Sequence, residues 1–431
     1  MNITAITAYQ MFDSRGSPTL EAVVTLENGV QGRGLVPSGA STGRFEALEL
    51  RDGDPAKFRG RAVGKAIAHV QGEIAAALRG RDVFAQRELD ELLAALDGTS
   101  NKSRLGANAL LGVSLAAVDA AAHCKHIPIC TYLSDGGVMT LPLPEIQIIG
   151  GGAHANRVID IQDVMVVAVG ARSYEETLEI THNVYHATGD LLAQRGLRCG
   201  IADEGGFWPR FTTNQEALEL CIAGMERAGY TPGVEAALSV DIAASDFYDP
   251  DRRVYQFRCE GRSFDTPAFC GLMADWCHRY AIVALEDPAA DTDRAGWRIM
   301  QRELGDKVTL IGDDLFVTNV ARIKQGIQEN LANAVLIKLN QIGTVSETMD
   351  AIKLTRAAGW LPVISARSGE TEDAFIAHLA VATHAPLLKV GAFARSERMA
   401  KWNEVLRIHH YLGAKAKFHG AAALVRLKPP T

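Results

Sequence analysis

Six short apolar runs in the second half of the chain each stop at, or lead into, charged or hydroxyl residues. They recur every few tens of residues, the length of one strand, one loop and one helix. In a parallel barrel of βα units, the carboxyl ends of the strands surround one mouth, where enzymes of this architecture keep their chemistry. Three carboxylates and two lysines are therefore predicted to converge on one pocket, the layout of a metal-assisted carbanion enzyme. The run ends are Asp241, Glu286, Asp313, Lys338, the segment 365–368 and Lys389.

Length and composition allow such a barrel and exclude several other classes of protein. A (βα)8 barrel takes about 250 residues, so a chain of 431 residues has room for a second domain. With 47% hydrophobic and 22% charged residues it can bury a full core. The net charge of −7, with both signs interspersed, argues against nucleic-acid binding. Seven cysteines without a CxxC pair predict reduced thiols.

Targeting and membrane signals are not expected from the sequence. The N-terminal residues show no basic region followed by an apolar stretch, so no signal peptide is predicted. No apolar run approaches the roughly 20 residues needed to span a bilayer. We expect a cytoplasmic protein without membrane association.

The pattern along the chain predicts an α/β protein of two domains. Residues 3–36 alternate apolar and polar, which predicts a small antiparallel sheet. The Gly- and Ser-rich stretch 38–43 predicts a mobile loop. Between 55 and 125 the apolar spacing is helical. The predicted organisation is an α+β domain over residues 1–137, followed by a barrel over residues 138–431.

The three carboxylates at the ends of the runs offer hard oxygen ligands. Such a set suits Mg²⁺, which prefers carboxylate oxygens and keeps waters that a substrate can replace. Histidine and cysteine are missing from the set, which disfavours zinc. The alternative is that each carboxylate only caps the next helix or forms a local ion pair. Three of them at consecutive strand ends, Asp241, Glu286 and Asp313, favour the metal site.

The two lysines follow strongly apolar runs. Partial burial and neighbouring cations lower the pKa of a lysine toward that of a usable general base. The alternative is a permanent ion pair with one of the carboxylates. For Lys338 the base role prevails if metal ions occupy those carboxylates, whereas Lys389 is predicted to bind an anionic substrate.

Two glycine-flanked loops carry further polar groups. Glu204 lies in the sequence Asp-Glu-Gly-Gly and is a candidate general acid toward a leaving hydroxyl, although this sequence also forms ordinary turns. The second loop leads from Gly150 to His154, a lone histidine of the kind that is more often structural.

Nine segments taken together resemble the enolase (phosphopyruvate hydratase) family along essentially the whole chain. The resemblance implies an enolase-type modified (βα)8 barrel preceded by an α+β capping domain, in a homodimer or higher homo-oligomer. The segments are DSRGSPT (13–19), VPSGASTG (36–43), DGTSNKSRLGANALLGVSLA (97–116), DEGGF (203–207), LEDP (285–288), GDDLFVTN (312–319), LIKLNQIGT (336–344), RSGETED (367–373) and RSER (395–398).

The resemblance implies a role for each candidate residue on the metal and base side of the site. The three carboxylates would bind the first Mg²⁺, and Lys338 would remove the proton alpha to the substrate carboxylate. Two Mg²⁺ ions and Lys389 would stabilise the resulting enolate; a lysine base with Mg²⁺ is the known arrangement of this superfamily. Ser41, in the mobile loop, would close over the site and bind the second Mg²⁺.

On the other side of the site, the resemblance implies groups that handle the hydroxide and the phosphate. Glu204 would assist the departure of hydroxide, and Gln162 and Asp163 stand where the family carries Gln-Glu. Arg367 and Ser368 would hold the phosphate, the arginine through paired hydrogen bonds. His154 would lie in another closing loop. The substrate would be a small phosphorylated carboxylate.

The chain departs from the family pattern near the same groups. Ala366 stands where the family has an active-site histidine. Asp163 stands where the family has glutamate, so its carboxylate is set back from the site by one methylene. Because the changes cluster on the groups that handle hydroxide and phosphate, we expect a diverged member. The other departures are Gly150 for asparagine, Trp208 and Arg210 after the Asp-Glu-Gly-Gly-Phe segment, and Val390 for threonine.

Three functions remain open from the sequence. The first is an Mg²⁺-dependent lyase acting on 2-phosphoglycerate and phosphoenolpyruvate or similar substrates. The second is a repurposed relative from phosphonate or secondary metabolism, of the carboxyphosphonoenolpyruvate synthase type. The third is a non-catalytic protein with the same fold, which the buried charges disfavour because a scaffold has no need of them.

Overall fold

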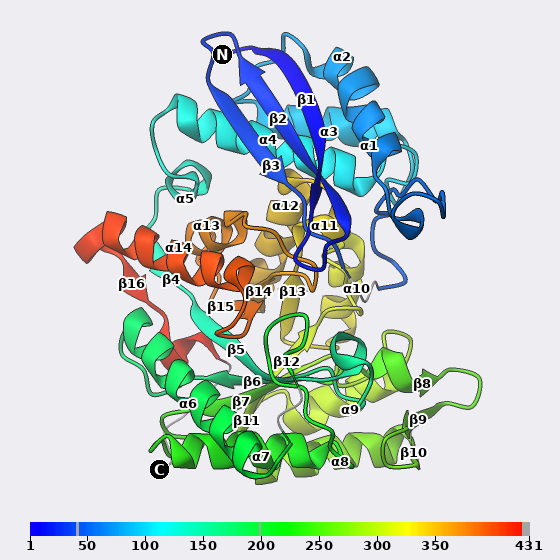
Figure 1. The fold of residues 1–431 in the computed structure, drawn as a ribbon, viewed down its shortest axis with the longest axis vertical. Coiled ribbons are helices and arrows are strands. Elements are labelled where there is room, and N and C mark those ends of the chain that lie inside the picture. The colour runs from blue at the N-terminus through cyan, green and yellow to red at the C-terminus, as the bar shows by residue number, and fades with distance from the viewer. Residues whose placement is uncertain (40–42, 198–199, 425–431) are drawn as a thin grey trace.

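The computed structural model describes residues 1–39, 43–197 and 200–424. The N-terminal part of the chain, blue to cyan in Figure 1, lies above a barrel formed by the rest. Ser41 falls outside the described residues.

The capping domain is built on an antiparallel sheet of β1 (Ile3–Phe12), β2 (Pro18–Leu26) and β3 (Gln31–Leu35). This is the sheet that the alternating pattern predicted. Helix α4 (Ala107–Cys124) packs across β2 and β3. A Cβ at Gly32 would lie 2.1 Å from the backbone nitrogen of Ala120, so the close approach requires glycine. The other helices of this domain are α1 (Gly64–His69), α2 (Ala75–Leu78), α3 (Gln86–Asp97) and α5 (Ile129–Leu133).

Among the described residues, α4 is the helix long and apolar enough to cross a membrane by length and composition. The sequence-based expectation that no run comes close to that length was too strict. The helix is apolar because 83% of it is buried inside the molecule, between the sheet and the neighbouring helices. Its composition is that of a core helix.

The described residues form a closed barrel of eight strands, in the order β5-β6-β7-β11-β12-β13-β14-β15. Neighbouring strands are parallel except at β6, which is antiparallel to both neighbours. The strands are β5 (Leu143–Gly150), β6 (Asp163–Val167), β7 (Ala237–Asp241), β11 (Ile282–Glu286), β12 (Thr309–Gly312), β13 (Ala334–Ile337), β14 (Leu361–Ser365) and β15 (Leu387–Gly391).

The resemblance implied a modified barrel, and the reversal of β6 is where this barrel differs from a regular one, in which all strands are parallel. The connection 151–162 holds one short turn of 3₁₀ helix at Gly152–Ala155, too little for the helical crossover that parallel neighbours require. The chain therefore turns back, and the start of β6 lies at the same mouth as the ends of the other strands. This places Asp163, the first residue of β6, in the mouth.

Helices surround the barrel on the outside, as Figure 1 shows. Side chains cap several of them; Ser173, for example, accepts a hydrogen bond from the backbone of Glu176 at the start of α6. A small hairpin sheet of β8 (Tyr248–Asp249), β9 (Val254–Phe257) and β10 (Arg262–Asp265) separates β7 from α8. The helices are α6 (Tyr174–Gln194), α7 (Gln215–Arg227), α8 (Thr266–Arg279), α9 (Arg294–Leu304), α10 (Val320–Glu329), α11 (Leu339–Ile342), α12 (Val345–Ala357), α13 (Phe375–Ala382) and α14 (Ser396–Leu412).

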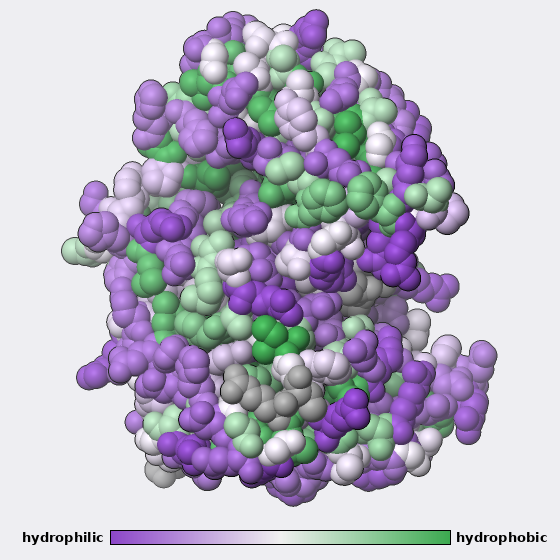
Figure 2. All heavy atoms as spheres, in the orientation of Figure 1, coloured by the Kyte–Doolittle hydropathy of each residue, from purple (hydrophilic) through white to green (hydrophobic). Residues whose placement is uncertain are grey.

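The capping domain docks on the barrel mouth through backbone pairing. Ser38 and Gly369 form an antiparallel bridge, with hydrogen bonds of 2.7 and 2.8 Å. The Ser38 hydroxyl donates to the Asp13 carboxylate at 2.5 Å. The loop after β14 is thereby tied to the first turn of the chain. Figure 2 shows a mostly hydrophilic face with small, separate apolar patches, and the six described cysteines are all free thiols.

Candidate active site

The structure gathers the predicted strand-end residues in one mouth. Asp241 and Glu286 are the last residues of β7 and β11, and Asp313 and Lys338 directly follow β12 and β13. Lys389 was predicted at a strand end but is the third of the five residues of β15. Its side chain still reaches across the barrel to the carboxylates.

Lys389 binds two of the candidate metal ligands directly. Its Nζ donates to Oδ2 of Asp241 at 2.8 Å and to Oε2 of Glu286 at 2.7 Å. Burial lowers the pKa of Lys389, but these two carboxylates outweigh it and hold the pKa well above its ordinary value. The pKa of Glu286 is raised well above the ordinary value by burial and by Asp241, and Lys389 opposes this. Lys389 is therefore a fixed cation.

Lys338 pairs with Asp313 in this structure. Burial lowers the pKa of Lys338, but the Asp313 carboxylate outweighs it, so the pKa is raised. The sequence-based expectation of a lowered pKa is therefore wrong for the structure as it stands, because a carboxylate and not a cation is the nearest charge. Gln341 donates to the other oxygen of Asp313 at 2.7 Å and fixes its orientation.

The carboxylates at the mouth fit a hard divalent cation. Oε1 of Glu286 is buried and has no hydrogen-bond partner among the described residues, which leaves a carboxylate oxygen available. Asp241 and Asp313 lie close enough to raise the pKa of Glu286 further. An all-oxygen donor set of this kind suits Mg²⁺. Asp287 also approaches Asp313, but its two oxygens accept the backbone N–H groups of Asp313 and Asp314 at 2.9 Å and shape the loop.

A second polar group forms where the loop after β5, the start of β6 and the loop 203–206 meet. One ligand-capable atom each from His154, Asp163 and Glu204 lies within 4.8 Å of the others, and all three residues are buried. Nδ1 of His154 is 3.4 Å from Oδ1 of Asp163 and 3.9 Å from Oε1 of Glu204. Gln162 donates to Oδ2 of Asp241 at 3.0 Å and links this group to the carboxylates.

The two acids of this group have pKa values shifted in opposite directions. Burial raises the pKa of Asp163, but His154 outweighs it and the net pKa is lowered. Burial keeps the pKa of Glu204 raised, although His154 opposes it. Burial also lowers the pKa of His154, but Asp163 and Glu204 bring it to about 8. Such a separation lets one carboxyl hold a proton while its neighbour is ionised.

The predicted phosphate-binding pair lies on the loop after β14. The Arg367 guanidinium contacts Glu46 of the capping domain at 2.9 and 3.2 Å and donates to Asn340 at 2.7 Å. The buried Arg398 donates to the backbone oxygens of Arg367 and Ser368 at 2.6 and 2.7 Å. A cavity of about 390 Å³ opens beside Arg367 and is lined by Glu46 and Asn340.

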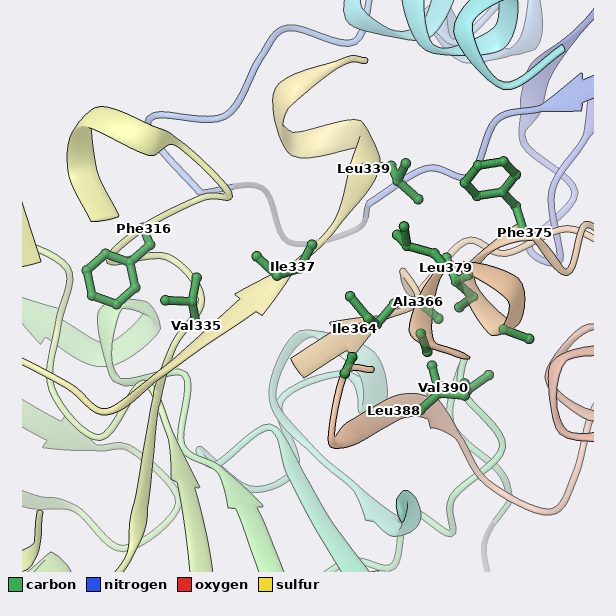
Figure 3. Packing of buried hydrophobic residues seen from close by; sticks show 14 of the residues in the cluster. Phe316, Val335, Ile337, Leu339, Ile364, Ala366, Phe375, Leu379, Leu388 and Val390 are labelled. Atoms are coloured by element: carbon green, nitrogen blue, oxygen red, sulfur yellow. The ribbon is translucent and has the colours of Figure 1, made fainter. Parts of the chain in front are cut away.

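Most departures from the family pattern lie at buried positions, whereas Trp208 is partly buried and Arg210 is exposed. Ala366 is 6% exposed and lies among buried hydrophobic side chains of β13, β14, β15 and α13 (Figure 3). Val390 belongs to the same cluster. A Cβ at Gly200 would lie 2.3 Å from Nε1 of Trp208, so this tryptophan covers the loop that leads to Glu204.

Sequence reasoning missed several residues of the site. Glu145 and Gln147 were hidden in the apolar run of β5, yet they are two residues apart and so face the barrel interior together. That alternation was the available signal. Glu46 gave no local signal, because only the fold brings it to the mouth. Gln341 and Arg398 lie in two of the segments that carry the family resemblance, but no role was predicted for either.

The fold and the polar mouth define an α/β-barrel enzyme with a capping domain. The enolase N-terminal domain family matches residues 3–133, and the enolase C-terminal TIM barrel domain family matches residues 138–427. Enolase 1 of Desulfitobacterium hafniense (strain Y51) is 50% identical over 417 residues, which cover 96% of this chain and 95% of that protein. The chain belongs to the enolase family and is an enolase-type lyase.

Proposed function

We propose that this lyase interconverts 2-phosphoglycerate and phosphoenolpyruvate. The supporting observation is the strand order, in which β6 and β13 are four strands apart in a barrel of eight. The Asp163 group and Lys338 therefore face each other across the mouth. A substrate between them presents its alpha proton to one side and its leaving hydroxyl to the other, which is what the dehydration requires.

Each side of the mouth has the chemistry for its part of the reaction. Lys338 accepts the proton alpha to the substrate carboxylate in its neutral form. Glu204, whose pKa is raised by burial, gives its proton to the departing hydroxide. Asp163 and His154 hold Glu204 in place, and Gln162 contributes to binding. Lys389 stabilises negative charge on the substrate, while Arg367 and Ser368 bind the phosphate.

Asp241, Glu286 and Asp313 would hold Mg²⁺. Held by these residues, the ion would supply positive charge to the substrate carboxylate, and Asp313 as its ligand would be a weaker partner for Lys338. In this proposal Ser41, which lies outside the described residues, contributes to a second ion. Removal of Mg²⁺ with a chelator is expected to abolish turnover, and returning Mg²⁺ is expected to restore it.

The test is direct. Purified protein is incubated with 2-phosphoglycerate and Mg²⁺, and the ultraviolet absorbance of phosphoenolpyruvate is followed beside a bacterial enolase of known activity. Turnover within about tenfold of that enzyme supports the proposal. Binding of substrate and Mg²⁺ without turnover would contradict it.

The second candidate is the repurposed relative with another phosphorylated or phosphonate carboxylate as substrate. The departures at Asp163, among the groups proposed to handle hydroxide, and at Ala366, beside the proposed phosphate-binding pair, favour it. If it holds, the variant Ala366→His with Asp163→Glu gains 2-phosphoglycerate dehydratase activity. No gain would rule the second candidate out.

We also propose a homodimer or a higher homo-oligomer. Several large hydrophobic side chains are exposed on β1 and the turn beside it, including Tyr9 at 53%, Phe12 at 52% and Phe58 at 49%. Light scattering of the protein and of a Phe12→Asp variant tests this. The cytoplasmic location, and the division of the chain between residues 137 and 138, remain predictions.

A further inference from the structure

Gln147 connects the two acids of the site through one buried side chain. It lies on β5, its exposed fraction is zero, and its amide uses both ends. Nε2 donates to Oδ1 of Asp163, and Oε1 accepts the backbone N–H of Gly206 at 2.7 Å. Gly206 follows the Glu204-Gly205 pair directly. The same amide therefore fixes Asp163 on one side and the Glu204 loop on the other.

The residues packed around Gln147 restrict where its side-chain amide can lie. A Cβ at Gly206 would lie 2.6 Å from Oε1 of Gln147, so the loop packs on the amide without room for a side chain. A Cβ at Gly150 would lie 2.5 Å from Cβ of Ala202, in the same loop, and 3.5 Å from Nε2 of Gln147. Gly206 therefore makes room for the glutamine, whereas the close approach at Gly150 is to Ala202.

From this geometry we propose that Gln147 is a positioning residue that sets the distance between Asp163 and the Glu204 loop. Its long side chain reaches the short Asp163 carboxylate, so the two lengths form a matched pair. The pairing explains how a carboxylate one methylene shorter stays in contact with His154 and close to Glu204. The inference rests on the proposed function, because Gln147 would set the distance between two groups of the side of that site that handles the hydroxide.

The matched lengths can be exchanged without changing the total number of methylenes. Gln147→Asn shortens the amide, and Asp163→Glu lengthens the acid. Each variant alone breaks or crowds the contact, and we expect kcat to fall on the order of 100-fold, since about 1 Å at a catalytic group has that effect. Together the two changes restore the contact, and kcat is expected to recover to within about tenfold of the wild type.

Gln215→Asn is the matched control. Gln215 donates to Glu219 at 2.7 Å on the exposed surface of α7, so this variant removes a glutamine–carboxylate contact away from the mouth. It is expected to keep wild-type kcat. A second readout separates positioning from general damage: exchange of the alpha proton of 2-phosphoglycerate in deuterated water. Because Lys338 lies on the opposite side of the barrel, Gln147→Asn is expected to slow dehydration while exchange continues, with KM little changed.

Two results would overturn the proposal. One is a double variant as impaired as the product of the two single effects. The other is a Gln147→Asn variant with wild-type kcat.

If the wild type neither exchanges nor dehydrates 2-phosphoglycerate, the proposed function fails. The Gln147 inference is then judged from the free energies of unfolding of the same four proteins. It predicts non-additive effects at 147 and 163, and additive effects would refute it.

Discussion

Lys338 and Lys389 are the same residue type in one barrel mouth, yet their neighbours give them different chemistry. Lys389 lies between Asp241 and Glu286, and no single change of partner would leave it neutral. Lys338 depends on Asp313 alone for an ion pair among the described residues. The lysine with one removable partner is the one suited to lose its charge and act as base.

Replacing Lys338 by alanine is expected to lower kcat by about 10²–10⁴-fold, the usual range for a general base. Substrate binding should persist, because the phosphate and carboxylate contacts come from other residues. Steady-state rates and calorimetric titration with 2-phosphoglycerate measure both quantities. Lys353→Ala, at an exposed position on α12, is the control and should behave as wild type.

Glu286→Gln removes one negative charge and one oxygen ligand from the candidate metal site. Mg²⁺ affinity is expected to fall at least about tenfold, because hard cations are bound chiefly through carboxylate charge. Calorimetric titration with Mg²⁺ measures this without any assay of activity. Glu303→Gln, at an exposed position in the last turn of α9, serves as control. Unchanged Mg²⁺ affinity in Glu286→Gln would mean that Glu286 is not a ligand of the metal.

At the scale of elements, α13 and α14 are joined by a partly buried ion pair. His378 of α13 lies 3.2 Å from Glu404 of α14. Burial lowers the pKa of His378, but the Cys130 thiol and the Glu404 carboxylate outweigh it and raise the pKa to about 9. The pair supports the helices that lie behind β15, the strand that carries Lys389.

Because the pKa of His378 is higher in the folded state, its contribution to stability is complete below about pH 6.5 and is lost as the pH rises through about 9. Relative to His378→Gln, the wild type should therefore lose free energy of unfolding across that window. Chemical unfolding at several pH values measures the difference. His278→Gln, at an exposed position, should give a curve parallel to the wild type; a parallel curve for His378→Gln would contradict the prediction.

At the scale of the whole molecule, the site depends on the docking of two domains. The loop that carries Arg367 and Ser368 is clamped from the capping domain by Ser38 and Asp13, and Glu46 reaches Arg367 itself. Neither domain alone presents the proposed phosphate-binding loop in this form. We therefore expect substrate binding to be coupled to the docking.

Gly369→Ala tests that coupling. A Cβ at this position would lie 2.6 Å from Oδ2 of Asp13 and 2.6 Å from the Ser38 hydroxyl, so the two domains cannot keep their contact. We expect a loss of about 1–3 kcal/mol of stability and a raised KM. Gly271→Ala, where nothing lies within 4 Å of the new Cβ, should be neutral or stabilising. Equal effects of the two changes, measured by thermal unfolding and kinetics, would contradict this.

Local signals in the sequence were enough for the elements and for most candidate site residues. Alternation predicted the sheet of the capping domain, and the polar ends of the apolar runs predicted the mouth. Asp241, Glu286, Asp313 and Lys338 follow from strand periodicity, because parallel strands bring their carboxyl ends to one edge. The family resemblance supplied their expected roles.

Tertiary structure alone decided the charge states and the partners. The direction of the pKa shift of Lys338 depends on which residue, Asp313 or a cation, lies nearest in space, and the sequence does not contain that distance. Two further features join segments that are far apart in the chain. One is the reversal of β6, and the other is the pair of hydrogen bonds by which Gln147 links Asp163 to Gly206. A sequence pattern fixes which residues face a mouth, since that depends on local periodicity; burial and charge interactions arise only when distant segments pack together.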